Sequence, residues 1–98
     1  MNEEIIGFWE TDPDDTKSQQ VYGKVSIEFK TNGELIYTVQ LKGKIQKMFM
    51  TYEIKGNRLV TSQASASRTE ETDFKILPDG KLELGFDGIK SKYIKVNI

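Results

Sequence analysis

The stretch that decides the fold is VYGKVSIEFKTNGELIYTVQLK, residues 21–42. Apolar and polar residues alternate along each half, which is the pattern of a β-strand with one buried face. The dipeptide Asn32-Gly33 separates the halves and suits the positive φ values of a tight turn. We therefore predict an antiparallel hairpin with the following inner face: Val21, Gly23, Val25, Ile27, Phe29, Leu35, Tyr37, Val39 and Leu41.

The same alternation continues along the chain. It places further residues inward at Met48, Met50, Tyr52 and Ile54, at Thr72, Phe74 and Ile76, and at Leu82, Leu84 and Phe86. Turn-forming residues separate these runs, and no segment has the apolar stripe of a substantial helix. With residues 6–12 as a first strand, we predict an all-β fold of eight strands joined in series. Because closure removes exposed strand edges, such a meander favours an antiparallel up-and-down barrel.

Three segments depart from the simple pattern. Residues 58–64 have a mixed pattern, so no register is predicted there. Residues 13–20 form the longest polar connection, which we expect to contain at most one helical turn. The alternation changes phase between Tyr93 and Ile94, which predicts a β-bulge.

Composition limits the chemistry that the chain can perform. Its 98 residues are the length of one domain, so we predict a single domain over residues 1–98. Histidine and cysteine are absent, which excludes Ser-His-Asp and Cys-His catalysis, zinc sites of the Cys/His type and disulfides. Nothing in the sequence fixes two carboxylates together in a pocket. We therefore predict no enzyme, no catalytic residue, no cofactor and no metal site.

Charge is unevenly distributed, although the net charge is only −1. Residues 1–16 carry six acidic side chains and no basic one, whereas residues 17–58 carry eight basic and three acidic ones. Aromatic residues interleave with lysines in residues 22–55, as in proteins that bind single-stranded nucleic acid. Most of these aromatics are predicted to point inward, so we do not expect nucleic-acid binding.

Targeting signals are not evident. The residues after Met1 lack the basic and apolar regions of a secretory signal, and no apolar run approaches the roughly 20 residues of a membrane span. We therefore expect a cytoplasmic protein. The lack of cysteine also suits a periplasmic or lipoprotein domain whose leader has been removed.

Gly7-Phe8-Trp9 resembles the Gly-x-Trp signature of lipocalins and related calycins. The spacing of later turns, such as residues 78–82, is similar to that of small bacterial lipocalin-like domains. The resemblance implies an eight-stranded up-and-down barrel with Trp9 packed at its closed end. It also implies a basic residue of the last strand lying over Trp9, for which the candidates are Lys90, Lys92 and Lys95. Because the chain is shorter than an ordinary lipocalin, the resemblance implies a smaller or absent cavity.

The inward residues of such a barrel are candidates for ligand binding. An eight-stranded barrel either fills itself or holds one small ligand. If it holds one, we expect these residues to contact it: Tyr37, Met48, Met50, Tyr52 and Arg68. Arg68 shares an inward register with Glu70, so the two could pair with each other or bind an acidic group. Alternatively, residues 68–71 are a frayed and solvated strand start.

Other residues are candidates for contact with a protein. Phe49 falls on the outward side of its strand, where an exposed aromatic ring needs a reason. Asp12, Asp14 and Asp15 are expected to form a solvated acidic loop that could attract or repel a partner.

Two hypotheses for function follow. The first is a non-enzymatic module that holds an apolar or amphipathic small molecule. The alternative is a protein-interaction module with a filled barrel, such as a bacterial toxin-neutralising immunity protein or an inhibitor.

Overall fold

The computed structural model describes residues 3–63, 68–86 and 89–96. The elements are, in order, a 3₁₀-helix η1 (Glu3–Ile5), β1 (Gly7–Thr11), α1 (Thr16–Tyr22), β2 (Lys24–Phe29), β3 (Glu34–Leu41), β4 (Lys44–Lys55), β5 (Arg58–Gln63), β6 (Arg68–Ile76), β7 (Leu82–Phe86) and β8 (Ile89–Val96).

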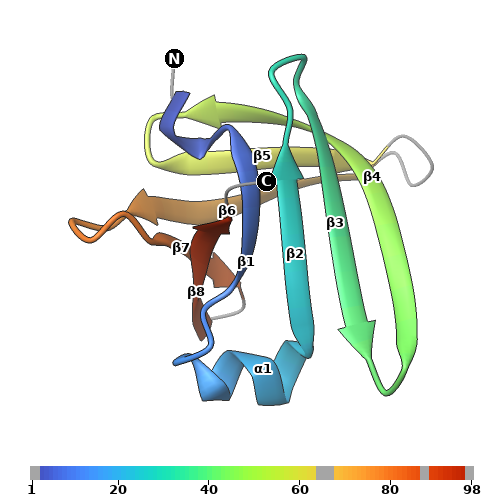
Figure 1. Ribbon diagram of the computed structural model, residues 1–98. Helices are drawn as coiled ribbons and strands as arrows, with labels where there is room; N and C mark the ends of the chain where they lie inside the picture. Colours follow the sequence, from blue (N-terminus) through green and yellow to red (C-terminus); the bar gives the residue numbers. More distant parts are fainter. Residues whose placement is uncertain (1–2, 64–67, 87–88, 97–98) are drawn as a thin grey trace.

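The eight strands form one closed barrel in sequence order (Figure 1). Each strand runs antiparallel to the next, and β8 pairs with β1 to complete the circle. The predicted all-β, up-and-down barrel is therefore confirmed. The β2–β3 hairpin has the predicted register, with Ile27 opposite Tyr37 and Phe29 opposite Leu35.

Trp9 lies at the centre of the closed end. Its side chain is only 1% exposed, and its indole N–H donates a 2.8 Å hydrogen bond to the carbonyl of Ile5 in η1. The Nζ atom of Lys95 lies 5.6 Å from the centre of the Trp9 ring. The structure therefore places Trp9 as a plug, with Lys95 as the basic residue over it, as the resemblance implies.

The predicted bulge in the last strand is wrong. Lys95 pairs directly with Trp9, and Tyr93 pairs with Thr11, so the register of β8 is continuous. Residues directly opposite each other share a face of the sheet. Ser91, Tyr93 and Lys95 thus form one inward series, which the lysine disguised in the sequence because its charged end reaches solvent beyond the ring.

The first connection holds more helix than predicted. Helix α1 has seven residues and includes residues 21 and 22, which the sequence pattern had assigned to a strand. Asp15 caps its start by accepting a hydrogen bond from the Ser18 N–H. Gly23, at φ 76°, ends it.

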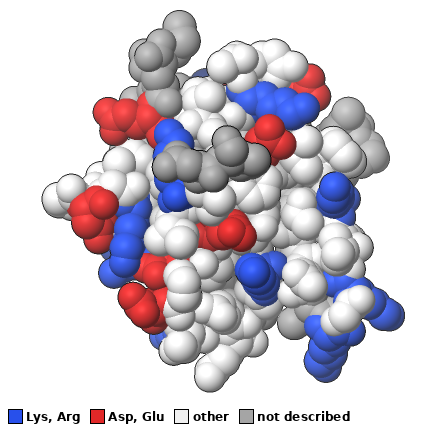
Figure 2. Space-filling view, viewed as in Figure 1, with Lys and Arg blue, Asp and Glu red and all other residues white. Residues whose placement is uncertain are grey.

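The barrel interior is apolar along most of its length. The buried hydrophobic residues are Ile5, Trp9, Val25, Ile27, Phe29, Leu35, Leu59, Phe74, Leu82, Leu84 and Tyr93. Outside, lysine and arginine side chains gather at the lower right of the molecule, where the β3–β4 turn lies, and the two charge signs mix on the left (Figure 2).

Gly7 has a specific role in seating the lysine over Trp9. Its φ is 132°, and a Cβ atom added here would lie 2.9 Å from Cε of Lys95. We expect Gly7→Ala to lower the free energy of unfolding by about 2 kcal/mol, through backbone strain and displacement of Lys95. Urea unfolding followed by Trp9 fluorescence measures this.

Two controls separate strain from displacement. Gly56→Ala adds a side chain at φ 63° with nothing within 4 Å, so its cost is strain alone. In a Lys95→Ala background, Gly7→Ala should cost about 1 kcal/mol less than in the native chain, because the colliding atom is gone. An unchanged cost in that background would show that Lys95 is not the reason for the glycine.

Candidate functional site

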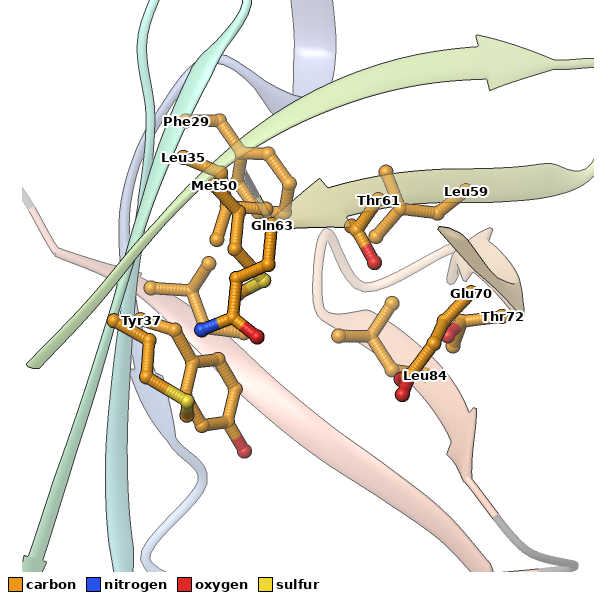
Figure 3. Close-up of a pocket in the computed structure, with 12 residues that line it drawn as sticks. Phe29, Leu35, Tyr37, Met50, Leu59, Thr61, Gln63, Glu70, Thr72 and Leu84 are labelled. Carbon is orange, nitrogen blue, oxygen red and sulfur yellow. The ribbon is translucent and has the colours of Figure 1, made fainter. Parts of the chain in front are cut away.

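The side chains that the structure describes do not fill the barrel. A cavity of about 300 Å³ lies among β2 to β7. Most of its lining is apolar, formed by Ile27, Phe29, Leu35, Tyr37, Met48, Met50, Leu59 and Leu84. In Figure 3, Leu59 and Leu84 lie on the same side as the polar residues Thr61, Glu70 and Thr72. The interior thus has the concave, mainly apolar character of a small-ligand site.

Three of the five residues predicted to bind a ligand line this cavity. They are Tyr37 on β3 and Met48 and Met50 on β4. The backbone of Arg68 pairs with Gln63, but the Arg68 side chain lies outside the described part of the structure. Ligand binding by all of these residues stays a prediction.

Tyr52 is not among the cavity-lining residues. Its hydroxyl donates a 2.7 Å hydrogen bond to the carbonyl of Lys30, and its ring packs edge-on against Phe29 with the centroids 5.1 Å apart. Burial raises the pKa of the Tyr52 hydroxyl. Tyr52 therefore braces the β2–β3 turn.

The cavity also has polar lining residues, and sequence reasoning missed half of them. Four residues form what we call the polar strip: Thr61 and Gln63 of β5, and Glu70 and Thr72 of β6. Thr61 lies directly opposite Glu70. Thr72 is buried whereas Glu70 is exposed, so the strip runs from the interior to solvent.

The missed residues have a recognisable signal. Leu59, Thr61 and Gln63 alternate inward from the β4–β5 turn, but two of the three are polar, which made the pattern of residues 58–64 appear mixed. The inward register predicted for Glu70 is confirmed, and the stretch from Arg68 onward is a paired strand.

Within the described residues, β5 pairs with β4 only from Thr51 to Lys55, although β4 begins at Lys44. The two strands diverge beyond this pairing (Figure 1), and Met48 of β4 and Gln63 of β5 both line the cavity. At the same end of the barrel, α1 is tied to β8 by a 2.8 Å hydrogen bond between Ser18 and Ser91.

The acidic residues after β1 are not a solvated loop. Asp12 is only 3% exposed, and its carboxylate lies 2.8 Å from Nζ of Lys81. The hydrogen bond from Lys81, with a second from the Asp14 N–H, lowers the pKa of Asp12. The expectation of solvation is therefore wrong for Asp12, because the sequence could not reveal a lysine 69 positions away. Asp14 is exposed.

Asp15 is also occupied within the molecule. Besides capping α1, its carboxylate accepts a 2.9 Å hydrogen bond from the Lys92 N–H of β8. Burial alone would raise the pKa of Asp15, but the hydrogen bonds from Lys92 and Ser18 outweigh it and lower the pKa. Contact of these aspartates with a partner stays a prediction, but Asp12 and Asp15 have structural roles.

Phe49 has the predicted exposure. Its side chain is 65% exposed on the outer face of β4, and so is that of Ile45. Among the described residues, no group of three acidic, histidine or cysteine side chains is placed to hold a metal ion. Within the same residues, no helix has the length and apolar character needed to cross a membrane.

These features define a lipocalin-like barrel: eight antiparallel strands in sequence order, a short helix before β1 and a buried tryptophan at the closed end. The chain is similar to the crystal structure of a lipocalin-like protein from Bacteroides uniformis, with a TM-score of 0.66 and 18% sequence identity. The match covers 95% of this chain and 99% of the other. The two proteins therefore share a fold. No family model and no curated protein matches the sequence.

The Asp12–Lys81 pair predicts an acid-sensitive fold. Because the pKa of Asp12 is lowered from 3.8 in the folded state, the ionised pair stabilises the protein above this value. That stability is lost as the pH falls through the folded-state pKa. We expect urea midpoints to fall from pH 5 to pH 2, and Asp12→Asn to show a lower midpoint at pH 7 and a shallower decline. The Asp12→Asn variant should keep part of the decline, because the pKa of Asp15 is also lowered in the folded state.

Glu53→Gln, which removes an exposed carboxylate from the outer face of β4, controls for the change in net charge. An Asp12→Asn curve parallel to the native one would show that the pair does not contribute to acid sensitivity.

Proposed function

We propose that this protein is a binding module for a small molecule with an apolar body and a polar end. The observation that supports it is the cavity of about 300 Å³, at the small end of the range for ligand pockets. The two methionines provide an adaptable apolar wall. The polar strip runs along β5 and β6 toward solvent, which favours a ligand whose polar end points outward.

We also propose that the module acts without catalysis. Glu70 is the one carboxylate among the described residues that line the cavity. General acid–base chemistry on a bound substrate generally requires a second positioned group of suitable pKa. Tyr37, the other ionisable residue of the lining, belongs to the opposite wall, on β3.

The alternative function, a protein-interaction module, assumed a filled barrel and an exposed Phe49. The described side chains leave a cavity in the barrel, so the interior gives no support to a module that acts only through its surface. The exposed Phe49 is as expected. A role as an inhibitor or a toxin-neutralising protein stays a prediction.

Cavity binding is tested with the apolar fluorophore N-phenylnaphthylamine. We expect its fluorescence to rise on binding to the native protein. Met50→Trp should weaken binding roughly tenfold or more because the indole occupies the cavity, and Met48→Phe should weaken it less. Phe49→Thr, which alters the outer face between these methionines, should leave binding unchanged.

Circular dichroism and cooperative urea unfolding establish that each variant folds. The proposal fails if the native protein does not bind the probe, or if folded Met50→Trp and Met48→Phe bind it as well as the native protein does.

The polar strip is tested by competition with 1-decanol. Thr61→Val combined with Gln63→Leu keeps the shape of the wall and removes hydrogen-bonding groups. We expect it to weaken displacement of the probe by decanol roughly fivefold, because neutral hydrogen bonds to the hydroxyl are lost. Ser62→Ala, on the outer side of the same strand, is the matched control. Equal displacement in all three proteins would show that the strip does not orient the ligand.

A further inference from the structure

A second feature lies on the outside of the barrel, in residues 44–50, which we call the β4 arm. These residues pair with β3 along their whole length, from Lys44 opposite Leu41 to Met50 opposite Leu35. On the other side, β5 reaches only Thr51. Within the described ranges, no strand pairs with the arm there, and Figure 1 shows β4 and β5 diverging. Alternate backbone N–H and C=O groups of the arm therefore point away from the sheet.

The arm is also exposed on its faces. Ile45 and Phe49 are each 65% exposed on the outer side, and Phe49 lies opposite the half-buried Ile36. The side chain of Gln46, on the other face, is exposed as well. The arm thus offers backbone hydrogen-bonding groups next to apolar side chains, which are the two components of strand addition by a peptide.

The charged side chains of the arm and of the turn that joins it to β3 have one sign. Residues 35–52 contain Lys42, Lys44 and Lys47 and no acidic residue. In Figure 2, the corner of the molecule at the β3–β4 turn is basic, without acidic side chains beside it. An incoming strand that carries carboxylates would meet complementary charge along this edge.

The same lysines disfavour a second copy of this chain. A two-fold antiparallel pairing of two arms centred on Lys47 places that lysine opposite itself. A pairing centred between residues 45 and 46 places Lys44 opposite Lys47. Like charges directly opposite each other destabilise a strand pair, and edge lysines are a common protection against self-association.

A nucleic acid could contact the lysines and Phe49, but it could not pair with the backbone edge of β4 as a strand does. Its phosphates and bases provide no ladder of amide donors and acceptors at the spacing of a β-strand. We propose that the β4 arm binds an extended, acidic segment of a partner protein by adding it to β4 as a further strand. Met48 and Met50 of the arm line the cavity with their inward side chains, whereas the added strand would bind the backbone edge and the outer side chains. The proposal therefore does not depend on the proposed ligand-binding function.

The test uses a fluorescein-labelled nine-residue peptide, acetylated and amidated, in which glutamate alternates with valine. Fluorescence polarisation with the native protein should show saturable binding. Two control peptides should bind at least roughly tenfold more weakly. One has methylated backbone amides, which cannot complete the strand ladder, and the other has lysine in place of glutamate.

Protein variants locate the site. We expect Lys44→Glu combined with Lys47→Glu to weaken binding about tenfold. Lys90→Glu, an exposed lysine on β8, is the matched control and should change binding less than about twofold. Hydrogen exchange should show slower exchange of the amides of residues 44–50 when the peptide is bound.

Several results would overturn the proposal. They are no binding of the acidic peptide, equal binding of the methylated peptide, and protection of amides elsewhere than in the arm. A concentration-dependent dimer that protects residues 44–50 without peptide would assign the edge to a second copy. Tighter binding of a ten-nucleotide oligothymidylate at the same lysines would assign it to nucleic acid. None of these outcomes decides whether the cavity binds a ligand, because the assay with N-phenylnaphthylamine tests that separately.

Discussion

The pairing of β1 with β8 is the constraint on which the rest of the structure depends. It joins the two ends of the meander, so that the first and last strands do not leave open edges. The same pairing sets Trp9 opposite Lys95 and Tyr93 opposite Thr11, which fixes the closed end. Gly7 belongs to this arrangement because the lysine chain passes through the space that a side chain would fill. The closed end is therefore packed by residues from the two termini of the described chain.

The part of the barrel away from Trp9 is shaped by the different lengths of β4 and β5. β4 is twelve residues long, but β5 is only six, so the two strands cannot pair along the whole of β4. One consequence is inside, where Met48 and Gln63 line a cavity on either side of the divergence. The other is outside, where no described strand pairs with the second edge of the first part of β4. A single mismatch in strand length thus accounts for both features to which we assign binding.

Sequence patterns predict the fold well where burial and alternation coincide. The β2–β3 hairpin and the exposed Phe49 follow from period two, because each side of those strands has one kind of environment. The burial of Trp9 was implied by the resemblance that Gly7-Phe8-Trp9 carries. The pattern fails where an inward position is polar, as at Thr61, Gln63 and Lys95. It also fails for Asp12, whose burial depends on Lys81, a partner that only the folded chain brings close. Local patterns carry no information on such contacts.

These failures are informative about function. A polar residue facing a barrel interior generally costs stability unless hydrogen bonds or water satisfy it. Lys95 is explained by Trp9 and by the carbonyl of Glu4, to which it donates a hydrogen bond. Thr61 and Gln63 instead face a space that the described side chains do not fill. Positions at which a sequence departs from the pattern that best specifies its fold are often functional sites. The polar strip is therefore the part of the interior in which ligand recognition is best sought, more than the methionines of β4, which an ordinary core would also contain.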